Sequence, residues 1–139
     1  MTYVKSVVGS LVMRGARAGF GAGHSLRDVA ARLAEDIGEL RDCGGFPAAV
    51  RTTITVLPYQ RLLKIRVDGL SVEADPDRTM IREVMNTLFE LASYHNIVDL
   101  DVTRPPLFTQ HIVLHDADGE PFAAMVGAGV ADVELVMRQ

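Results

Sequence analysis

The sequence predicts an α+β domain in which two amphipathic helices pack on one face of a mostly antiparallel sheet of four to six strands. Apolar residues recur at helical spacing in residues 25–43 and 75–94, and at every second position in residues 50–67 and 108–126. Glycine, proline and aspartate separate these stretches, so turns bound each of them. A chain of 139 residues has the length of one domain with one core.

The first helix is predicted to begin after Ser25 and to end near Asp42 or Cys43. Ser25 and Asp28 have the spacing of an N-terminal capping box, in which each side chain accepts the backbone N–H of the other residue. Glycine at position 44 tolerates the positive φ that commonly ends a helix. One face is apolar, comprising Leu26, Val29, Ala30, Leu33, Ala34, Ile37 and Leu40.

Residues 50–57 and 62–67 are predicted to form a hairpin around a turn at residues 58–61, because β-branched residues alternate with polar ones. The inward residues are Val50, Thr52, Ile54, Val56, Leu63, Ile65 and Val67. Arg51, Lys64 and Arg66 then fall together on the outer face, among threonines. This face is basic and lacks aromatic residues.

The second helix is predicted to begin at Asp75 and Pro76, since aspartate caps a helix and proline fits its first position. It extends to about Tyr94. Short strands are expected at residues 97–102, 108–114 and 120–126, with a hairpin turn at residues 116–119. Residues 130–138 fit either a last strand or a short helix, and we favour the strand.

Residues 1–24 are interpreted as a basic, glycine-rich N-terminal arm, and residues 25–139 as a single α+β domain. The arm holds Lys5, Arg14 and Arg17 but none of the 18 acidic residues of the chain. Its first half has helical spacing, yet valine and glycine disfavour a helix, so a strand or a partner-dependent arm also fits. We expect its apolar residues to contact a partner, namely Val4, Val7, Val8 and Leu11.

The net charge of −4 excludes massed carboxylates of the kind that mimic DNA, and it has the wrong sign for a simple non-specific nucleic-acid binder. No apolar run approaches the ~20 residues of a membrane span. Cys43 is the single cysteine, which rules out an intramolecular disulfide and a cysteine-based metal site. We therefore expect a cytoplasmic protein without cofactor, metal or membrane partner.

The sequence contains no nucleophile-elbow, zinc-protease or Walker motif. His111 and His115 are four residues apart, which on a strand separates them by about 13 Å and prevents them from sharing a metal. The acidic residues 116–120 match a turn better than a calcium loop. An enzyme is the minority interpretation, and its site would gather His95, Asp99, Asp101 and His111.

Two other hypotheses are favoured over an enzyme. The first is a non-catalytic accessory or interaction module that docks to a protein partner or to itself. The second is a nucleic-acid-binding protein that uses the basic hairpin face and the arm. Its phosphate contacts would be Lys5, Arg14, Arg17, Arg51, Lys64 and Arg66.

Residues 25–114 resemble a domain associated with the large polyvalent proteins of phages and conjugative elements. In that family a helix leads to a P-x-V-[KR]-x-[ST]-V strand, and a later Y-N precedes an acidic strand. The matching residues here are Pro47, Val50, Arg51, Thr53, Val56, Tyr94, Asn96, Asp99 and Asp101. The resemblance implies a mobile-element setting and assigns no catalytic residue.

Overall fold

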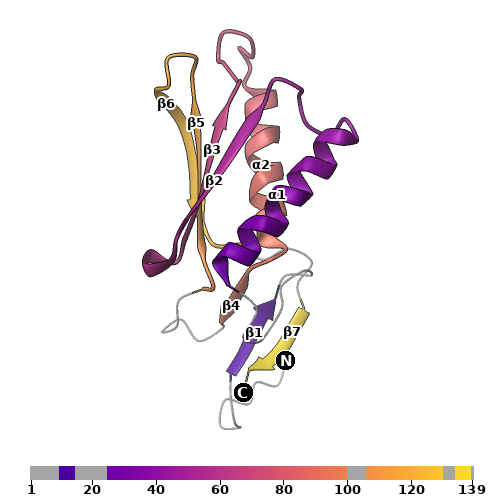
Figure 1. Ribbon diagram of the computed structural model, residues 1–139, viewed down its shortest axis with the longest axis vertical. Helices are drawn as coiled ribbons and strands as arrows, with labels where there is room; N and C mark the ends of the chain where they lie inside the picture. Colours follow the sequence, from indigo (N-terminus) through magenta and orange to yellow (C-terminus); the bar gives the residue numbers. More distant parts are fainter. Residues whose placement is uncertain (1–9, 15–24, 100–105, 130–133, 139) are drawn as a thin grey trace.

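The structure is a computed structural model that describes residues 10–14, 25–99, 106–129 and 134–138. Its helices are α1 (Leu26–Asp42) and α2 (Thr79–Ser93), and its strands are β1 (Ser10–Arg14), β2 (Arg51–Leu57), β3 (Leu62–Asp68), β4 (Ile97–Asp99), β5 (Thr109–His115), β6 (Pro121–Gly127) and β7 (Glu134–Arg138). The larger sheet has the order β2-β3-β5-β6, and the smaller one has the order β4-β1-β7. Both helices cover the same face of the larger sheet (Figure 1). The predicted α+β architecture is confirmed.

Helix α1 forms as its capping signals predict. The Ser25 hydroxyl accepts the N–H of Asp28 at 3.2 Å, and the Asp28 carboxylate accepts the N–H of Ser25 at 3.3 Å. The helix ends at Asp42, and Gly44 follows with φ of 77°. The reciprocal cap and the glycine satisfy backbone groups that a helix end otherwise leaves unpaired.

Helix α2 begins later than the sequence predicts, at Thr79 rather than at Pro76. The reason is that residues 75–78 close a turn, in which the N–H of Arg78 donates to the carbonyl of Asp75 at 2.9 Å. Proline is favoured at the second position of such a turn. Asp75 still satisfies the helix end, because its carboxylate accepts the N–H of Ile81 at 2.8 Å.

The predicted β2–β3 hairpin and its faces are confirmed. Ile54 lies opposite Ile65, and a short 3-10 turn (Pro58–Gln60) joins the two strands. Strand β3 then pairs in parallel with β5, and α2 makes the crossover between them. The core joins the inward residues of this sheet to both helices, and its fully buried members include Val29, Leu33, Leu63, Ile65, Leu88, Phe108, Ile112 and Leu114.

The smaller sheet takes part of the N-terminal arm into the fold. Residues 10–14 form β1, which pairs with β4 on one side and with β7 on the other. Strand β7 is the strand that we favoured for residues 130–138. This sheet lies at the end of the molecule opposite the β5–β6 turn (Figure 1). Neither α-helix in the described ranges has the length and apolarity to cross a membrane.

Candidate functional site

The basic residues predicted for the hairpin do lie on one face of the larger sheet, opposite the helices. Arg51, Lys64 and Arg66 are all exposed there. Lys64 lies in register with Thr55 on β2 and with His111 on β5. The structure therefore brings together the three body residues of the predicted phosphate-binding set.

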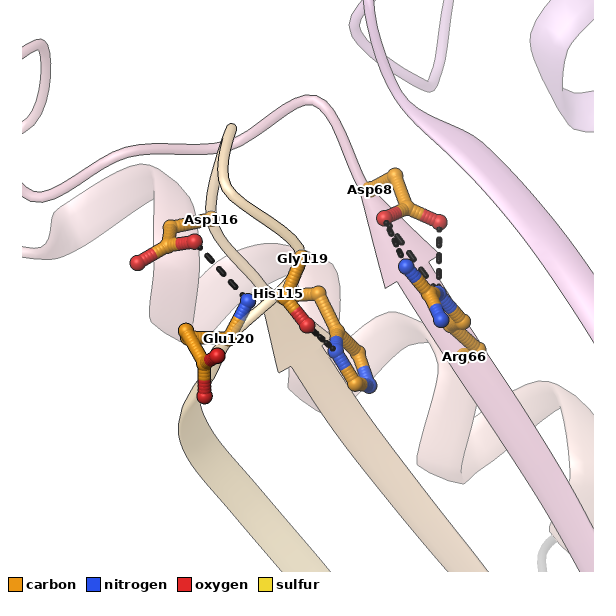
Figure 2. Close-up of polar contacts among 6 residues, drawn as sticks. All are labelled: Arg66, Asp68, His115, Asp116, Gly119 and Glu120. Carbon is orange, nitrogen blue, oxygen red and sulfur yellow. Dashed lines mark hydrogen bonds and ion pairs between the residues drawn. The ribbon is translucent and has the colours of Figure 1, made fainter.

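One of these cations is already paired. The Arg66 guanidinium binds the Asp68 carboxylate through two contacts of 3.1 Å (Figure 2). These hydrogen bonds lower the pKa of Asp68, and the charges of Arg66, His115 and Arg51 add to the effect. Because both side chains remain substantially exposed, at 45% and 36%, the pair adds little to stability. It nevertheless offsets much of the positive charge at this end of the face.

The acidic stretch at residues 116–120 forms the predicted turn. The Asp116 carboxylate accepts the N–H groups of Asp118 and Glu120 at 2.9 and 3.0 Å, and Gly119 has φ of 82°. A ring nitrogen of His115 lies 2.9 Å from the Gly119 carbonyl (Figure 2). One oxygen of Asp116 is therefore occupied by backbone donors. Across the described ranges, no three His, Cys, Asp or Glu side chains lie close enough to hold a metal.

The histidines of the enzyme hypothesis lie on opposite sides of the sheet. His95 is 1% exposed on the helix side, whereas His111 follows the outward register of Lys64. Asp99 ends β4, and Asp101 lies outside the described residues. The structure thus does not bring His95 and His111 into one site.

His95 instead contacts a residue that the sequence analysis did not single out. Its Nε2 lies 2.9 Å from the Asp36 carboxylate of α1, and both side chains are buried. The residues are 59 positions apart, so no local pattern joins them. One signal was present: Asp36 lies between Leu33 and Ile37 at the spacing of the buried face of α1. A carboxylate in that position requires a buried partner.

A group of buried polar side chains joins the end of α2 to the start of β5. The Gln110 amide donates to the Phe89 carbonyl at 3.2 Å and to the Ser93 hydroxyl at 3.0 Å. Asn96 bonds both the N–H and the carbonyl of Phe108, at 3.3 and 3.0 Å. These side chains satisfy backbone groups and fix β5 against α2, which is a structural role.

A groove separates the first half of α2 from the first half of β6 and has a volume of about 470 Å³. Its apolar lining consists of Val72, Ile81, Met85, Phe122, Ala123 and Ala124, and its charged rim consists of Asp77, Arg78 and Arg82. At the other end the chain lies close to α2: a Cβ on Gly127, the last residue of β6, would lie 3.5 Å from the Phe89 ring, and one on Gly129 would lie 2.7 Å from it. The space is therefore a wedge, open at the start of both elements.

The opposite side of α2 carries a groove of different charge. It has a volume of about 530 Å³ and lies between α2 and residues 44–47. Its ionisable lining residues are Glu83 and Glu90, and Met80 lines it with a side chain that is 45% exposed. The groove beside β6 has an arginine rim, whereas this groove is acidic.

The predicted docking arm is described only in part. Val4, Lys5, Val7, Val8 and Arg17 lie outside the described residues. Leu11 is in register with Met137, and Arg14 with Ile97 and Glu134. Because β1 is paired on both sides, its backbone is not available to a partner strand.

These observations define a class of protein: a small α+β domain that, among the residues described, has one open, partly basic sheet face and a groove beside an edge strand with a neighbour on one side only. No family model, curated protein or solved structure matches the chain.

Proposed function

We propose that the chain is a non-catalytic accessory protein that binds a protein partner through the edge strand β6. The observation that carries this proposal is the chemistry of the edge. Strand β6 contains no charged residue, and Val126 is 62% exposed on it. An unpaired edge presents free N–H and C=O groups, and monomeric proteins usually protect it with charges, proline or a covering element. An uncharged, apolar edge is typical of a strand that is paired in an assembly.

Two protective devices are present, but both lie at one end of the strand. Pro121 is its first residue, and the register shifts between Leu114 and His115 on the neighbouring strand. Both features terminate pairing beside the turn. They leave the stretch from Phe122 to Gly127 unprotected, which is enough length for a strand addition.

The contacts of the buried ionisable and polar side chains support a non-catalytic role. His95 faces Asp36 in the interior, and the Ser93 hydroxyl donates to the Phe89 carbonyl at 2.7 Å. A nucleophile needs a base within reach and an open site, and these groups are directed at helix backbone and a buried carboxylate instead. We also propose, on the sequence resemblance alone, that the protein belongs to a phage or conjugative element. The single cysteine supports the further proposal that it acts in the cytoplasm.

A matched pair of edge variants tests the proposal. Ala124→Lys with Val126→Lys places two cations on the exposed face of β6, and Thr53→Lys with Thr55→Lys does the same on the other edge strand. We expect wild type and the β2 variant to retain the same protein from a native-host extract, and the β6 variant to lose it. Retention by the β6 variant, or equal loss by both, would contradict docking through β6.

Docking of Val4, Val7, Val8 and Leu11 to a partner, and self-association, remain predictions. Light scattering of the full chain and of a chain lacking residues 1–9 tests self-association through the arm, because β1 begins at Ser10 and is retained. We expect the shortened chain to have a smaller oligomeric state if the arm joins two copies. Equal masses in both samples would remove self-association through the arm.

A nucleic-acid-binding protein is the second candidate, and the shared exposed face of Arg51, Lys64 and Arg66 favours it. The pairing of Arg66 with Asp68 weakens it, since a phosphate would have to compete with that carboxylate. The nucleic-acid hypothesis predicts salt-sensitive binding of DNA or RNA that is lost in the double variant Arg51→Glu with Lys64→Glu. Absence of binding at low salt would eliminate this candidate.

A further inference from the structure

We infer that the groove between α2 and β6 takes an extended partner segment with apolar side chains at alternate positions and acidic residues beside Arg78 and Arg82. This inference rests on the proposed docking through β6 and adds the chemistry of the partner. Its basis is the combination of a free strand edge, an apolar floor and a cationic rim at one place.

The free edge selects an extended chain. Only a strand aligned with β6 can use the backbone groups along its outer edge, because sheet pairing needs donors and acceptors at strand spacing. Every second side chain of such a segment points toward the helix side. There it meets Ile81 and Met85, which line the groove at 4% and 7% exposure, and the half-buried Phe122.

The remaining side chains of the added segment, at the positions between those that face the helices, lie on the open face of the sheet. Their neighbours on β6 are Ala124 and Val126, both exposed and neither charged. Small and β-branched apolar residues therefore suit this side as well, since they pack against cross-strand neighbours of the same kind. Apolar residues on both sides make the central part of the segment uncharged.

The rim sets the charge at one end. Arg78 precedes α2 and Arg82 lies in its first turn, and both are exposed. The one acid of the rim, Asp77, is exposed and accepts the N–H of Thr79 at 3.1 Å. Its charge offsets one of the two arginines, so the rim keeps a net positive charge. The positive end of the α2 dipole adds to the two arginines. An acidic group here gains attraction, whereas the groove across α2, with Glu83 and Glu90, repels it.

A selection experiment tests the inference without a known partner. The full-length protein is used to select binders from a library of random peptides of about ten residues, and each binder is measured by fluorescence anisotropy. We expect selected sequences to combine alternating Val, Ile or Leu with Asp or Glu at one end. Arg78→Glu with Arg82→Glu should weaken them about tenfold at low salt, and less at high salt.

Matched variants distinguish a failure of this inference from a failure of docking through β6. Arg27→Glu with Arg32→Glu makes the same charge change on exposed positions of α1 and should leave the affinity unchanged. Binders that are lost in the β6 lysine variant but carry no acid, or ignore the rim reversal, overturn this inference and leave docking through β6 intact. Binders that survive in the β6 lysine variant overturn both.

Two other results also decide the matter. If light scattering gives a dimer that the β6 lysine variant converts to a monomer, a second copy occupies the edge and the acidic segment is wrong. If the library yields no binder above the level of the β6 lysine variant, the groove does not take a peptide and the inference is overturned.

Discussion

The two edge strands of the larger sheet, β2 and β6, differ in chemistry although they have similar room beside them. A groove of about 440 Å³ lies between α1 and β2, and one of about 470 Å³ lies between α2 and β6. Strand β2 presents Arg51, Thr53 and Thr55 to solvent, whereas β6 presents Ala124 and Val126. Space alone therefore does not distinguish the edges, and the side chains do.

The backbone next to β2 is also engaged by a helix. The Arg41 side chain of α1 donates to the carbonyl of Val50, directly before the strand. Helix α1 lies along this side, and the buried contact between Asp36 and His95 joins it to the end of α2. On the β6 side, α2 contacts the strand end through Phe89 and leaves the first half open. The comparison indicates that β2 is the better protected edge and β6 the more available one.

The largest expected effect comes from loosening the attachment of α1, which lies beside the protected edge β2. His95→Ala leaves the Asp36 carboxylate buried beside a cavity, so we expect the free energy of unfolding to fall by about 3 kcal/mol in urea titrations. Amide exchange should accelerate in residues 51–57 more than in residues 121–127. His115→Ala, at the exposed turn, serves as the control and should cost less than about 1 kcal/mol. If the free energy of unfolding falls by less than about 1 kcal/mol in His95→Ala, the contact between Asp36 and His95 does not hold α1 in place beside β2.

The second prediction concerns the narrow end of the groove. In Gly129→Ala the new Cβ would lie 2.7 Å from the Phe89 ring and 2.8 Å from the Ser93 hydroxyl, so we expect a loss of about 2 kcal/mol. In Gly127→Ala the nearest Phe89 atom is 3.5 Å away, and the change should stay below about 0.5 kcal/mol. Thermal unfolding of the two variants measures the difference. Equal stabilities would mean that the chain just after β6 is not held against α2.

The smallest predicted effect tests the charge balance near β2. Asp68→Asn removes the carboxylate beside Arg66, Arg51 and His115. The pKa of Asp68 is lowered in the folded chain, so its stabilising contribution is present above the ordinary carboxyl pKa of about 3.9 and is lost as pH falls through the lower folded value. We expect a slightly lower melting temperature than wild type at pH 7 and no difference near pH 2. A difference that persists at pH 2 would assign the effect to packing.

Local signals in the sequence predicted the elements of this fold well. The Ser25 and Asp28 capping box, and the alternation through Leu63, Ile65 and Val67, act over a few residues and do not depend on the rest of the chain. The start of α2 was wrong by three residues, because an Asp-Pro sequence opens either a helix or a turn and residues 75–78 form the turn.

Long-range pairings could not be predicted in the same way. The parallel pairing of β3 with β5 depends on where α2 returns the chain, and the contact of His95 with Asp36 joins residues that only the packed helices bring together. The groove beside β6 depends on how closely Gly129 approaches Phe89. The basic hairpin face was predicted correctly, because strand alternation alone places Arg51, Lys64 and Arg66 on one side of the hairpin.

Hydrogen–deuterium exchange of the full-length protein, alone and saturated with a library-selected peptide, tests docking through β6 most directly. The account predicts slower exchange of amides in residues 121–127 and at the start of α2, with residues 51–57 unchanged. Protection of residues 51–57 with no change in residues 121–127 would contradict it.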